Sequence, residues 1–337
     1  MPNKMTRALA SIFLSVILHV SLAACAHKQR PENTADPGLS LQPLTFDGRE
    51  RSYYLHLPPG YTAVSRLPVV FVLHGGGRAD GDEVAGRTGY NRIADREGFI
   101  VVYPNGVDAR WNDGRGRTFR KSRDKADVDD VAYISGLIDR MVRDYKGDAS
   151  RIYITGLSNG GMMTFRLGCE ISGKLAAIAP VIANMPENNI GTCRPDAPLP
   201  VLLMNGTADP LMPWGGGSVG FLGKTMGRVA STADTVSFWR QHNHCSPVPK
   251  TELLADTDRN DGSSVTVSSY GNCLNNSPVV LYTIAGGGHS FPGGNIPDRP
   301  LLLGRKNNDI DAAEVIWAFF KAHNRQVGAR ENSSPNK

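Results

Sequence analysis

Ser158 is the residue whose surroundings best fit nucleophilic chemistry. It lies at the centre of Gly156-Leu157-Ser158-Asn159-Gly160, after the largely β-branched stretch 151–155 and before a predicted helix from about Gly161. A strand, a tight turn and a helix in this order form a nucleophile elbow, in which the glycines let a strained turn raise the serine hydroxyl above the sheet. We therefore predict that Ser158 is a nucleophile.

The same pattern occurs a second time around Ser218. With 37 glycines among 337 residues, G-x-S-x-G arises easily by chance, so the flanking residues must decide between the two copies. Residues 213–215 show no strand character, and no clear helix follows residue 220. We interpret the copy at 216–220 as a flexible loop.

A serine hydroxyl needs a general base, and the base needs an acid that orients it. In folds with a nucleophile elbow the serine is followed by Asp or Glu and then by His, each after a strand. Among the eight histidines, only His289 follows both a predicted strand, 279–284, and a glycine-rich turn. Asp209 lies in the loop after the apolar strand 201–204. We predict a triad of Ser158, Asp209 and His289; the alternative for Asp209 is an Asx-turn before proline.

Acyl transfer also needs two backbone N–H groups aimed at the developing oxyanion. The apolar strand 68–73 runs into a His-Gly-Gly-Gly segment at 74–77, where glycines allow a substrate to approach the backbone closely. We expect one donor from the neighbourhood of Gly76 and the other from the N–H of Asn159, directly after the nucleophile. The alternative for 74–77 is an ordinary glycine turn.

Six short motifs occur along the chain: LHGG at 73–76, VYPNG at 102–106, WNDG at 111–114, VDDV at 128–131, GLSNGG at 156–161 and GGHSFPGG at 287–294. Together they resemble the motifs of secreted polyhydroxybutyrate depolymerases and feruloyl esterases, a carbohydrate-esterase group that includes acetyl xylan esterases. In the last motif this chain has Ser-Phe where many members of that group have Thr-Trp. The resemblance covers roughly residues 42–323. It implies an α/β-hydrolase fold, with Ser158 as nucleophile, Asp209 as acid and His289 as base.

The elements that must position these residues alternate along the chain. We predict strands at 51–57 and 98–103, and a helix from about 131 to 141 with the 3.6-residue period of an amphipathic helix. Asp129 and Asp130 fit the N-cap and first turn of that helix better than an acid–base pair. The alternation predicts an α/β fold with a doubly wound, mostly parallel sheet and helices on both faces.

The first residues resemble a bacterial lipoprotein signal. Lys4 and Arg7 precede an uncharged stretch, 8–24, that is too short for a comfortable membrane span. The following Cys25 completes a Leu-Ala-Ala-Cys box, which by this resemblance implies lipid attachment at Cys25 and removal of residues 1–24. Ala26 rather than Asp follows the cysteine, which by the same resemblance favours the outer membrane. Simple secretion is the alternative.

The remainder divides into three segments. Residues 25–41 are expected to form a polar tether, 42–323 one α/β-hydrolase catalytic domain, and 324–337 a polar tail. With 40% hydrophobic residues, the chain can bury one large core. The net charge of +5 is not clustered, so we expect no nucleic-acid partner and no membrane contact beyond the N-terminal anchor.

The other cysteines, Cys169, Cys193, Cys245 and Cys273, are even in number, which in an exported chain predicts two disulfides with three possible pairings. Pairing Cys169 with Cys193 and Cys245 with Cys273 closes the shortest loops and fits the habit of the resembled family.

Two segments resemble metal sites only in part. Residues 242–245 lack a fourth zinc ligand with suitable spacing. Residues 256–262 begin like a calcium loop, but the glycine comes one position late and Val267 replaces the bidentate Glu. We interpret the second segment as a hairpin turn between 251–255 and 265–270. Neither a metal nor an organic cofactor is expected.

Trp111 and Trp214 are our candidates for the substrate pocket. Both lie in loops that follow predicted strands, where α/β folds bind ligands, and Trp214 precedes three glycines that could form a lid. Core packing is the alternative for each.

The sequence thus predicts a serine carboxylic-ester hydrolase that acts through an acyl-enzyme. By resemblance, feruloyl or acetyl esters of plant polysaccharide are the first substrates to expect. Hydroxyalkanoate oligomers come next. By the same resemblance, depolymerases of solid polyester usually carry a linker and a polymer-binding domain, whereas a short polar tail is expected here after Asn324, which makes the polymer a less favoured substrate. A serine peptidase of the same fold and a non-catalytic binding lipoprotein are the remaining alternatives.

Overall fold

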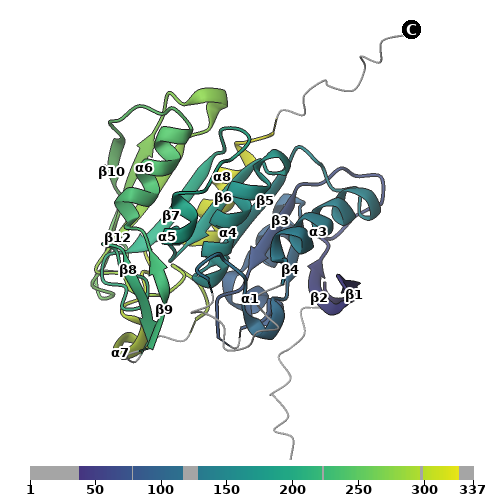
Figure 1. Cartoon of the computed structure of the whole chain (residues 1–337), viewed down its shortest axis with the longest axis horizontal. Helices are drawn as coiled ribbons and strands as arrows, with labels where there is room; N and C mark the ends of the chain where they lie inside the picture. Colours follow the sequence, from purple (N-terminus) through teal and green to yellow (C-terminus); the bar gives the residue numbers. More distant parts are fainter. Residues whose placement is uncertain (1–37, 78, 117–127, 222–223, 297–298, 326–337) are drawn as a thin grey trace, which may run out of the picture. The chain divides into compact units, whose positions relative to one another are not determined.

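A ten-stranded sheet forms the centre of the described structure, a computed structural model that describes residues 38–77, 79–116, 128–221, 224–296 and 299–325. The strand order is β1-β2-β4-β3-β5-β6-β7-β12-β11-β10 (Figure 1). These strands are β1 (Leu39–Phe46), β2 (Arg49–His56), β3 (Val69–Leu73), β4 (Ile100–Pro104), β5 (Ile152–Leu157), β6 (Ala177–Val181), β7 (Val201–Gly206), β10 (Lys250–Leu253), β11 (Ser264–Tyr270) and β12 (Val279–Ala285). The six central strands are β4, β3, β5, β6, β7 and β12, and each pairs in parallel with its neighbours in this set. The strands on either side of this set pair antiparallel. The predicted doubly wound, mostly parallel sheet is confirmed.

Helices cover both faces of this sheet. They are α1 (Gly81–Thr88), α2 (Tyr90–Glu97), α3 (Asp130–Asp144), α4 (Asn159–Glu170), α5 (Glu187–Ile190), α6 (Thr232–His242), α7 (Pro300–Leu303) and α8 (Ala312–Lys321), with short 3₁₀ turns at Val107–Ala109, Ser172–Lys174 and Leu274–Asn276. One hydrophobic cluster packs under α3, α4 and α6, and a second packs under α1, α2 and α8. In Figure 1, α3, α4 and α6 lie in front of the sheet and α8 behind it. Because both faces are covered, β3 to β7 are buried along their whole length.

None of the helices in the described ranges is long and apolar enough to cross a membrane. Residues 1–37, with the predicted signal, most of the tether and Cys25, lie outside those ranges.

Two segments differ from the sequence-based expectation. β1 begins at Leu39, so the predicted tether loses its last three residues to a strand that pairs with β2 along its whole length. The segment predicted as a flexible loop around Ser218 is a hairpin of β8 (Gly217–Phe221) and β9 (Lys224–Val229). The glycines of this hairpin weaken its strand signal in the sequence. A β-bridge between Pro186 and Val229 connects the hairpin to the segment before α5. The predicted pairing of β10 with β11 is confirmed.

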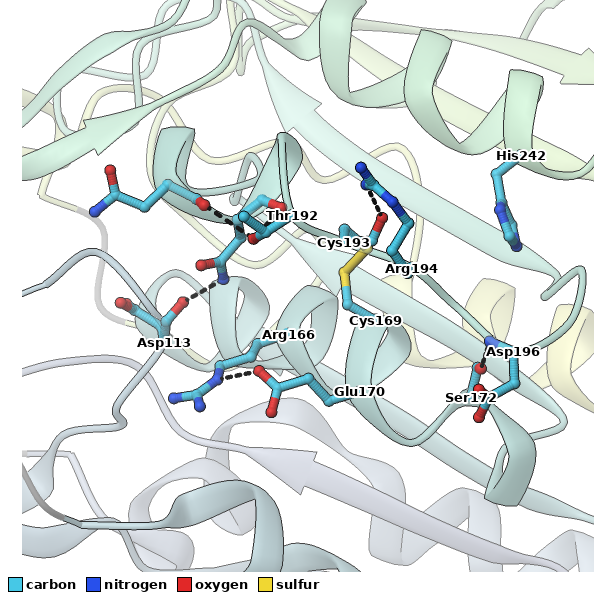
Figure 2. The surroundings of a disulfide bond; sticks show 12 residues. Asp113, Arg166, Cys169, Glu170, Ser172, Thr192, Cys193, Arg194, Asp196 and His242 are labelled. Atoms are coloured by element: carbon cyan, nitrogen blue, oxygen red, sulfur yellow. Dashed lines mark hydrogen bonds and ion pairs between the residues drawn. A yellow bond between two sulfur atoms is a disulfide. The ribbon is translucent and has the colours of Figure 1, made fainter.

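Both predicted disulfides are present. Cys169, in α4, bonds to Cys193, just after α5 (Figure 2). Cys245, after α6, bonds to Cys273, shortly before β12. Disulfides persist in oxidising compartments, so the two bonds fit a protein that is exported from the cytoplasm.

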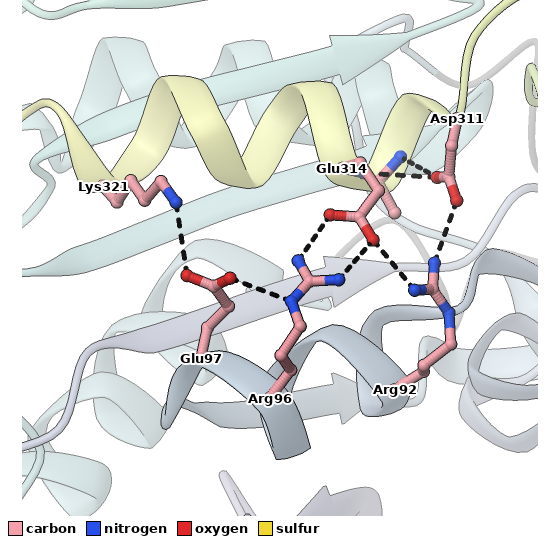
Figure 3. A network of polar contacts seen from close by, with 7 residues as sticks. Arg92, Arg96, Glu97, Asp311, Glu314 and Lys321 are labelled. Carbon is pink, nitrogen blue, oxygen red and sulfur yellow. Dashed lines mark hydrogen bonds and ion pairs between the residues drawn. The ribbon is translucent and has the colours of Figure 1, made fainter.

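An ion-pair network joins α2 to the start and end of α8 on the surface (Figure 3). Arg96 binds Glu97 and Glu314, and Arg92 binds Glu314 and Asp311. The hydrogen bonds from Arg96 hold the pKa of Glu314 below its usual range. These side chains are exposed to solvent, and water and salt weaken ion pairs in such positions. The network therefore connects α2 with α8 on the surface but is not a main source of stability.

The two aspartates at the start of α3 have separate structural roles. Asp129 is the N-cap, and its side chain accepts from the N–H of Ala132. Asp130 is fully buried and forms an ion pair at 2.9 Å with Nη2 of Arg51, itself almost fully buried. Its second oxygen accepts from the N–H of Asn112 at 2.7 Å. The sequence predicts Asp130 as a first-turn residue but does not reveal its ion pair, because Arg51 lies 79 positions earlier in the chain.

Replacing Asp130 with alanine should lower the free energy of unfolding by about 3–5 kcal/mol, because it leaves a buried guanidinium without its carboxylate. Denaturant unfolding of the disulfide-bonded protein measures this. Asp129→Ala is the matched control and should cost about 1 kcal/mol, the usual value for an N-cap. Equal losses in the two variants would contradict the assignment of Asp130 as half of a buried ion pair.

Candidate active site

Ser158 lies at a strained turn between β5 and α4. Its backbone has φ 54° and ψ −113°, an unusual conformation for a residue with a side chain. The glycines on either side are required by space: a Cβ at Gly156 would lie 2.5 Å from the carbonyl oxygen of Gly160, and one at Gly160 would lie 2.5 Å from that of His74. The turn is therefore the elbow that the G-x-S-x-G pattern predicts, with Ser158 at its apex.

Asp209 and His289 are in direct contact. They follow β7 and β12, which are parallel neighbours in the sheet. Asp209 Oδ2 lies 2.7 Å from Nδ1 of His289, and the two side chains are 2% and 9% exposed. The other carboxylate oxygen accepts from the N–H groups of Leu211 and Met212, each at 2.8 Å. Asp209 thus makes the local turn contacts of the alternative interpretation and also binds the histidine.

The two loops that carry these side chains are bonded to each other and to a third segment. The N–H of Ala208 donates to the carbonyl of Gly287 at 3.0 Å. The N–H groups of Gly288 and His289 donate to the carbonyls of Arg305 and Leu303. The acid and the base are therefore held by backbone bonds that do not depend on the identity of nearby side chains.

Ser158 and His289 both line one cavity of about 500 Å³. Most of its wall is apolar, contributed by Val84, Leu157, Met162, Ile182, Leu211, Val219, Met226, Ile296 and Leu303. Arg87, Arg110 and Arg115 also line the cavity, and the guanidinium of Arg115 is held in a buried ion pair with Asp113. A mostly apolar cavity with a few polar groups beside a reactive serine is typical of a small-molecule substrate site.

Gly76 and Asn159 also line this cavity. Asn159 is the first residue of α4, where backbone N–H groups have no partner inside the helix. A Cβ added at Gly75 would lie 3.8 Å from that of Ser158, so the glycine segment runs directly beside the nucleophile. Gly76 and Asn159, the residues expected to supply the oxyanion donors, therefore line the same cavity as Ser158.

Neither tryptophan lines the cavity, which corrects the expectation for both. Trp111 is fully buried, and its ring packs against that of His74 with centroids 4.8 Å apart. Trp214 packs against the first hydrophobic cluster, and its carbonyl accepts from Thr232. A loop position after a strand does not say which way an indole faces, and here both turn toward packed residues.

The β8–β9 hairpin supplies the wall that Trp214 was expected to supply. Val219 from β8 and Met226 from β9 line the cavity. Ser218, in the second copy of the serine motif, is exposed and is not part of the wall. Residues 224–229 read Lys-Thr-Met-Gly-Arg-Val, without the strict alternation of apolar and polar residues that marks a strand, so the local pattern does not reveal this element.

A buried polar cluster behind Asn159 was missed in the sequence. Asp113 Oδ2 accepts from the side-chain amide of Asn159 at 2.6 Å and pairs with Arg115 at 2.7 Å. The amide of Asn189 donates to the carbonyl of Asp113 at 2.9 Å. Figure 2 shows Asp113 beside the segment that ends at Cys193. The WNDG motif points to this loop, but the partners Asn159 and Asn189 lie 46 and 76 positions further along the chain.

Among the residues that the structure describes, no three His, Cys, Asp or Glu side chains are grouped so that they could hold a metal ion. The segment 256–263 instead binds Asp309, which accepts from the N–H groups of Thr257 and Asp258. This contact ties the β10–β11 loop to the segment that follows α7.

His74 is buried in its neutral form. Burial lowers its pKa to about 4. The N–H of Gly106 donates to its Nε2 at 2.9 Å, so Nε2 has no proton and the proton is on Nδ1, which donates to the carbonyl of Gly75 at 2.7 Å. The tautomer is thus set by two backbone partners.

Because His74 is neutral in the folded protein, the free energy of unfolding should decrease as the pH decreases. Because its folded pKa is about 4 and the ordinary value is 6.5, the unfolded chain takes up the proton first as pH falls. This contribution is fully present above pH 6.5 and is lost toward pH 4, with about 2 kcal/mol lost between pH 7 and pH 5. Denaturant unfolding at these two pH values measures the loss.

His74→Asn should show a smaller loss of stability over the same pH interval. The control is His244→Asn, at an exposed histidine, which should retain the wild-type dependence. An unchanged pH dependence in His74→Asn would contradict the assignment. His323 contributes in the same direction, because burial also lowers its pKa.

The chain is similar to known esterases. Residues 51–182 match the family model described as "Esterase PHB depolymerase". The chain is 31% identical over 300 residues to "Putative esterase NocK" of Nocardia uniformis subsp. tsuyamanensis, covering 87% of this chain and 85% of that protein. It is 28% identical to "Probable feruloyl esterase C" of Aspergillus terreus, covering 93% and 98%.

Two further matches, one to a curated protein and one to a solved structure, differ in how much of the matched protein this chain covers. The chain is 27% identical to "Bifunctional acetylxylan esterase/xylanase XynS20E" of Neocallimastix patriciarum, but spans only 32% of that protein's length. Among solved structures, the acetyl xylan esterase from Aspergillus awamori aligns with a TM-score of 0.50 at 17% identity, covering 72% of this chain and 92% of that one. At this identity the structural match supports the fold alone.

Proposed function

Because the chain belongs to the esterase family that includes polyhydroxybutyrate depolymerases and feruloyl esterases, we propose that Ser158, His289 and Asp209 are its nucleophile, base and acid. The chain is a carboxylic-ester hydrolase, as its esterase relatives indicate. The observation that supports these roles is the 2.7 Å contact of Asp209 with His289, on a histidine that shares a cavity wall with the elbow serine.

In the first step, Oγ of Ser158 attacks the carbonyl carbon of the ester, and its proton passes to Nε2 of His289. The Asp209 carboxylate accepts from Nδ1–H of the histidine, which fixes the tautomer and stabilises the imidazolium that forms. The N–H groups of Asn159 and Gly76 donate to the oxyanion. Collapse of this intermediate releases the alcohol, which takes the proton from His289, and leaves an acyl-enzyme on Ser158.

In the second step, water attacks the acyl-enzyme. His289 takes a proton from that water and returns it to Oγ of Ser158 as the acid product leaves. The apolar wall of the cavity excludes other water from the acyl group, which strengthens the hydrogen bonds to the oxyanion.

For the substrate, we propose feruloyl or acetyl esters of plant polysaccharide. The names of the relatives, feruloyl esterase and acetylxylan esterase, support this class. The cavity of about 500 Å³ with an apolar wall has room for an aromatic acyl group. Hydroxyalkanoate oligomers are the second candidate, because the matching family model is described as a depolymerase of that polyester.

A covalent probe and a substrate panel test the proposal. A fluorophosphonate should label Ser158, seen by mass spectrometry of the peptide that contains it. Labelling should vanish in Ser158→Ala and persist in Ser218→Ala, the matched control from the second copy of the motif. The panel holds methyl ferulate, an acetylated xylooligosaccharide, 3-hydroxybutyrate oligomers and a chromogenic peptide. Turnover of the peptide alone would favour a peptidase, and labelling of Ser218 would contradict the assignment of the nucleophile.

We also propose that the exported protein is a lipoprotein anchored through Cys25, and that the outer membrane is its location. The support is the Leu-Ala-Ala-Cys box in the sequence, together with two disulfides that fit an exported chain. Mass spectrometry of membrane-fraction protein should find a diacylglyceryl group on Cys25. An unmodified product beginning elsewhere would exclude the anchor.

A further inference from the structure

We propose that Trp111 is a positioning residue that joins the two halves of the oxyanion site. The inference rests on the esterase mechanism proposed above and assigns a role to a residue that does not touch the cavity. The two expected donors, the N–H groups of Gly76 and Asn159, come from chain segments more than 80 positions apart. Since an oxyanion site works only when its donors are fixed before the reaction, something must hold these segments in register.

Trp111 binds the glycine segment through its ring. Its indole N–H donates to the carbonyl of His74 at 2.9 Å, which fixes the peptide plane between His74 and Gly75. The ring also packs on the imidazole of His74, whose Nδ1–H donates to the carbonyl of Gly75. That carbonyl and the N–H of Gly76 belong to one planar peptide unit and point in opposite directions. Trp111 therefore contributes to the direction of the first donor.

Trp111 binds the nucleophile segment through its backbone. Its N–H donates to Oδ1 of Asn159 at 2.8 Å, and its carbonyl accepts from Nδ2 of the same side chain at 3.2 Å. Asn159 is 2% exposed, and its amide also donates to Asp113. The residue that supplies the second donor is thus held by three hydrogen bonds to the loop of Trp111.

These contacts connect one fully buried residue, which does not line the cavity, to both segments that carry the expected donors. A displacement of either donor by a fraction of an ångström weakens the bond to the oxyanion while leaving the cavity wall in place. Removing the indole N–H should therefore lower kcat and leave KM nearly unchanged.

The test is Trp111→Phe, which keeps an aromatic ring and removes the N–H. We expect kcat for the preferred ester to fall by about 10- to 100-fold, with KM within about threefold of wild type. The matched control is Trp239→Phe. Trp239 is also fully buried, lies outside the cavity wall, and its indole N–H has no partner among the described residues.

A thionoester of the same acid and alcohol separates positioning from general damage. Sulfur accepts hydrogen bonds poorly, so the donors assist a thionoester less than an ester. Trp111→Phe should lower the ratio of ester to thionoester turnover, and Trp239→Phe should leave the ratio at the wild-type value. If Trp111→Phe does not fold, benzothienylalanine at position 111 replaces it, because this analogue keeps the indole shape and removes only the N–H.

Each outcome has one meaning. A fall in kcat with a lower ester-to-thionoester ratio supports the positioning role. An unchanged kcat, or an equal fall for both substrates, overturns it and leaves the esterase mechanism intact. An absence of Ser158-dependent turnover in the wild-type protein would instead reject the proposed function.

Discussion

Replacing Ser158 with alanine is expected to lower kcat for ester hydrolysis by about 10⁵- to 10⁶-fold. Alanine cannot form the acyl-enzyme, so only binding and the oxyanion donors remain to assist direct attack by water. Steady-state hydrolysis of the preferred ester measures the loss, and thermal unfolding should show that the variant is folded.

The loss should not grow when the base is removed as well. His289→Ala alone should cost about as much as Ser158→Ala, and the double variant should be close to either single one, because the two groups act in one proton transfer. Ser218→Ala, the control from the exposed copy of the motif, should keep wild-type activity. Losses that multiply in the double variant would show that Ser158 and His289 do not act together.

Replacing Asp209 with asparagine is expected to lower kcat by about 10⁴-fold. An amide can donate to Nδ1 of His289, which would leave the proton on Nε2, the nitrogen that must accept from Ser158. The substitution keeps the size of the side chain, and its Oδ1 can still accept from Leu211 and Met212. The expected defect is therefore in the tautomer of His289 and not in the loop.

Activity as a function of pH checks this explanation. If the asparagine stabilises the wrong tautomer, alkaline conditions should restore part of the lost activity, because hydroxide can take over the role of the base. Asp234→Asn is a control at the N-terminus of α6, where Asp234 contacts Ser231 and not the cavity. A loss below tenfold in Asp209→Asn would mean that another group orients His289.

The sequence located the residues of the candidate site because each follows its own strand. Ser158, Asp209 and His289 were identified from local patterns, and the carboxyl ends of parallel strands meet at one edge of a sheet. The fold class followed from the same alternation of strands and helices. These features depend on short stretches of chain, which a single sequence displays directly.

Features that depend on distant partners were not found in the same way. Asp130 looks like a first-turn residue until Arg51 is seen beside it, and Trp111 looks like a pocket residue until its ring is seen against His74. The β8–β9 hairpin was hidden by its glycines, which weaken strand signals although the strands pair in space. In each case the missing information is the direction of a side chain or the identity of a neighbour.

The Cys169–Cys193 bond connects the redox state of the compartment to the proposed oxyanion site. It fixes the segment from which Asn189 donates to Asp113, and Asp113 in turn accepts from Asn159. A chain in the reducing cytoplasm lacks this bond, so we expect the support behind Asn159 to be loose until export. The producing cell would then keep its own esters from the fully active enzyme, and recombinant preparations from cytoplasm and periplasm would differ in kcat although their sequences are identical.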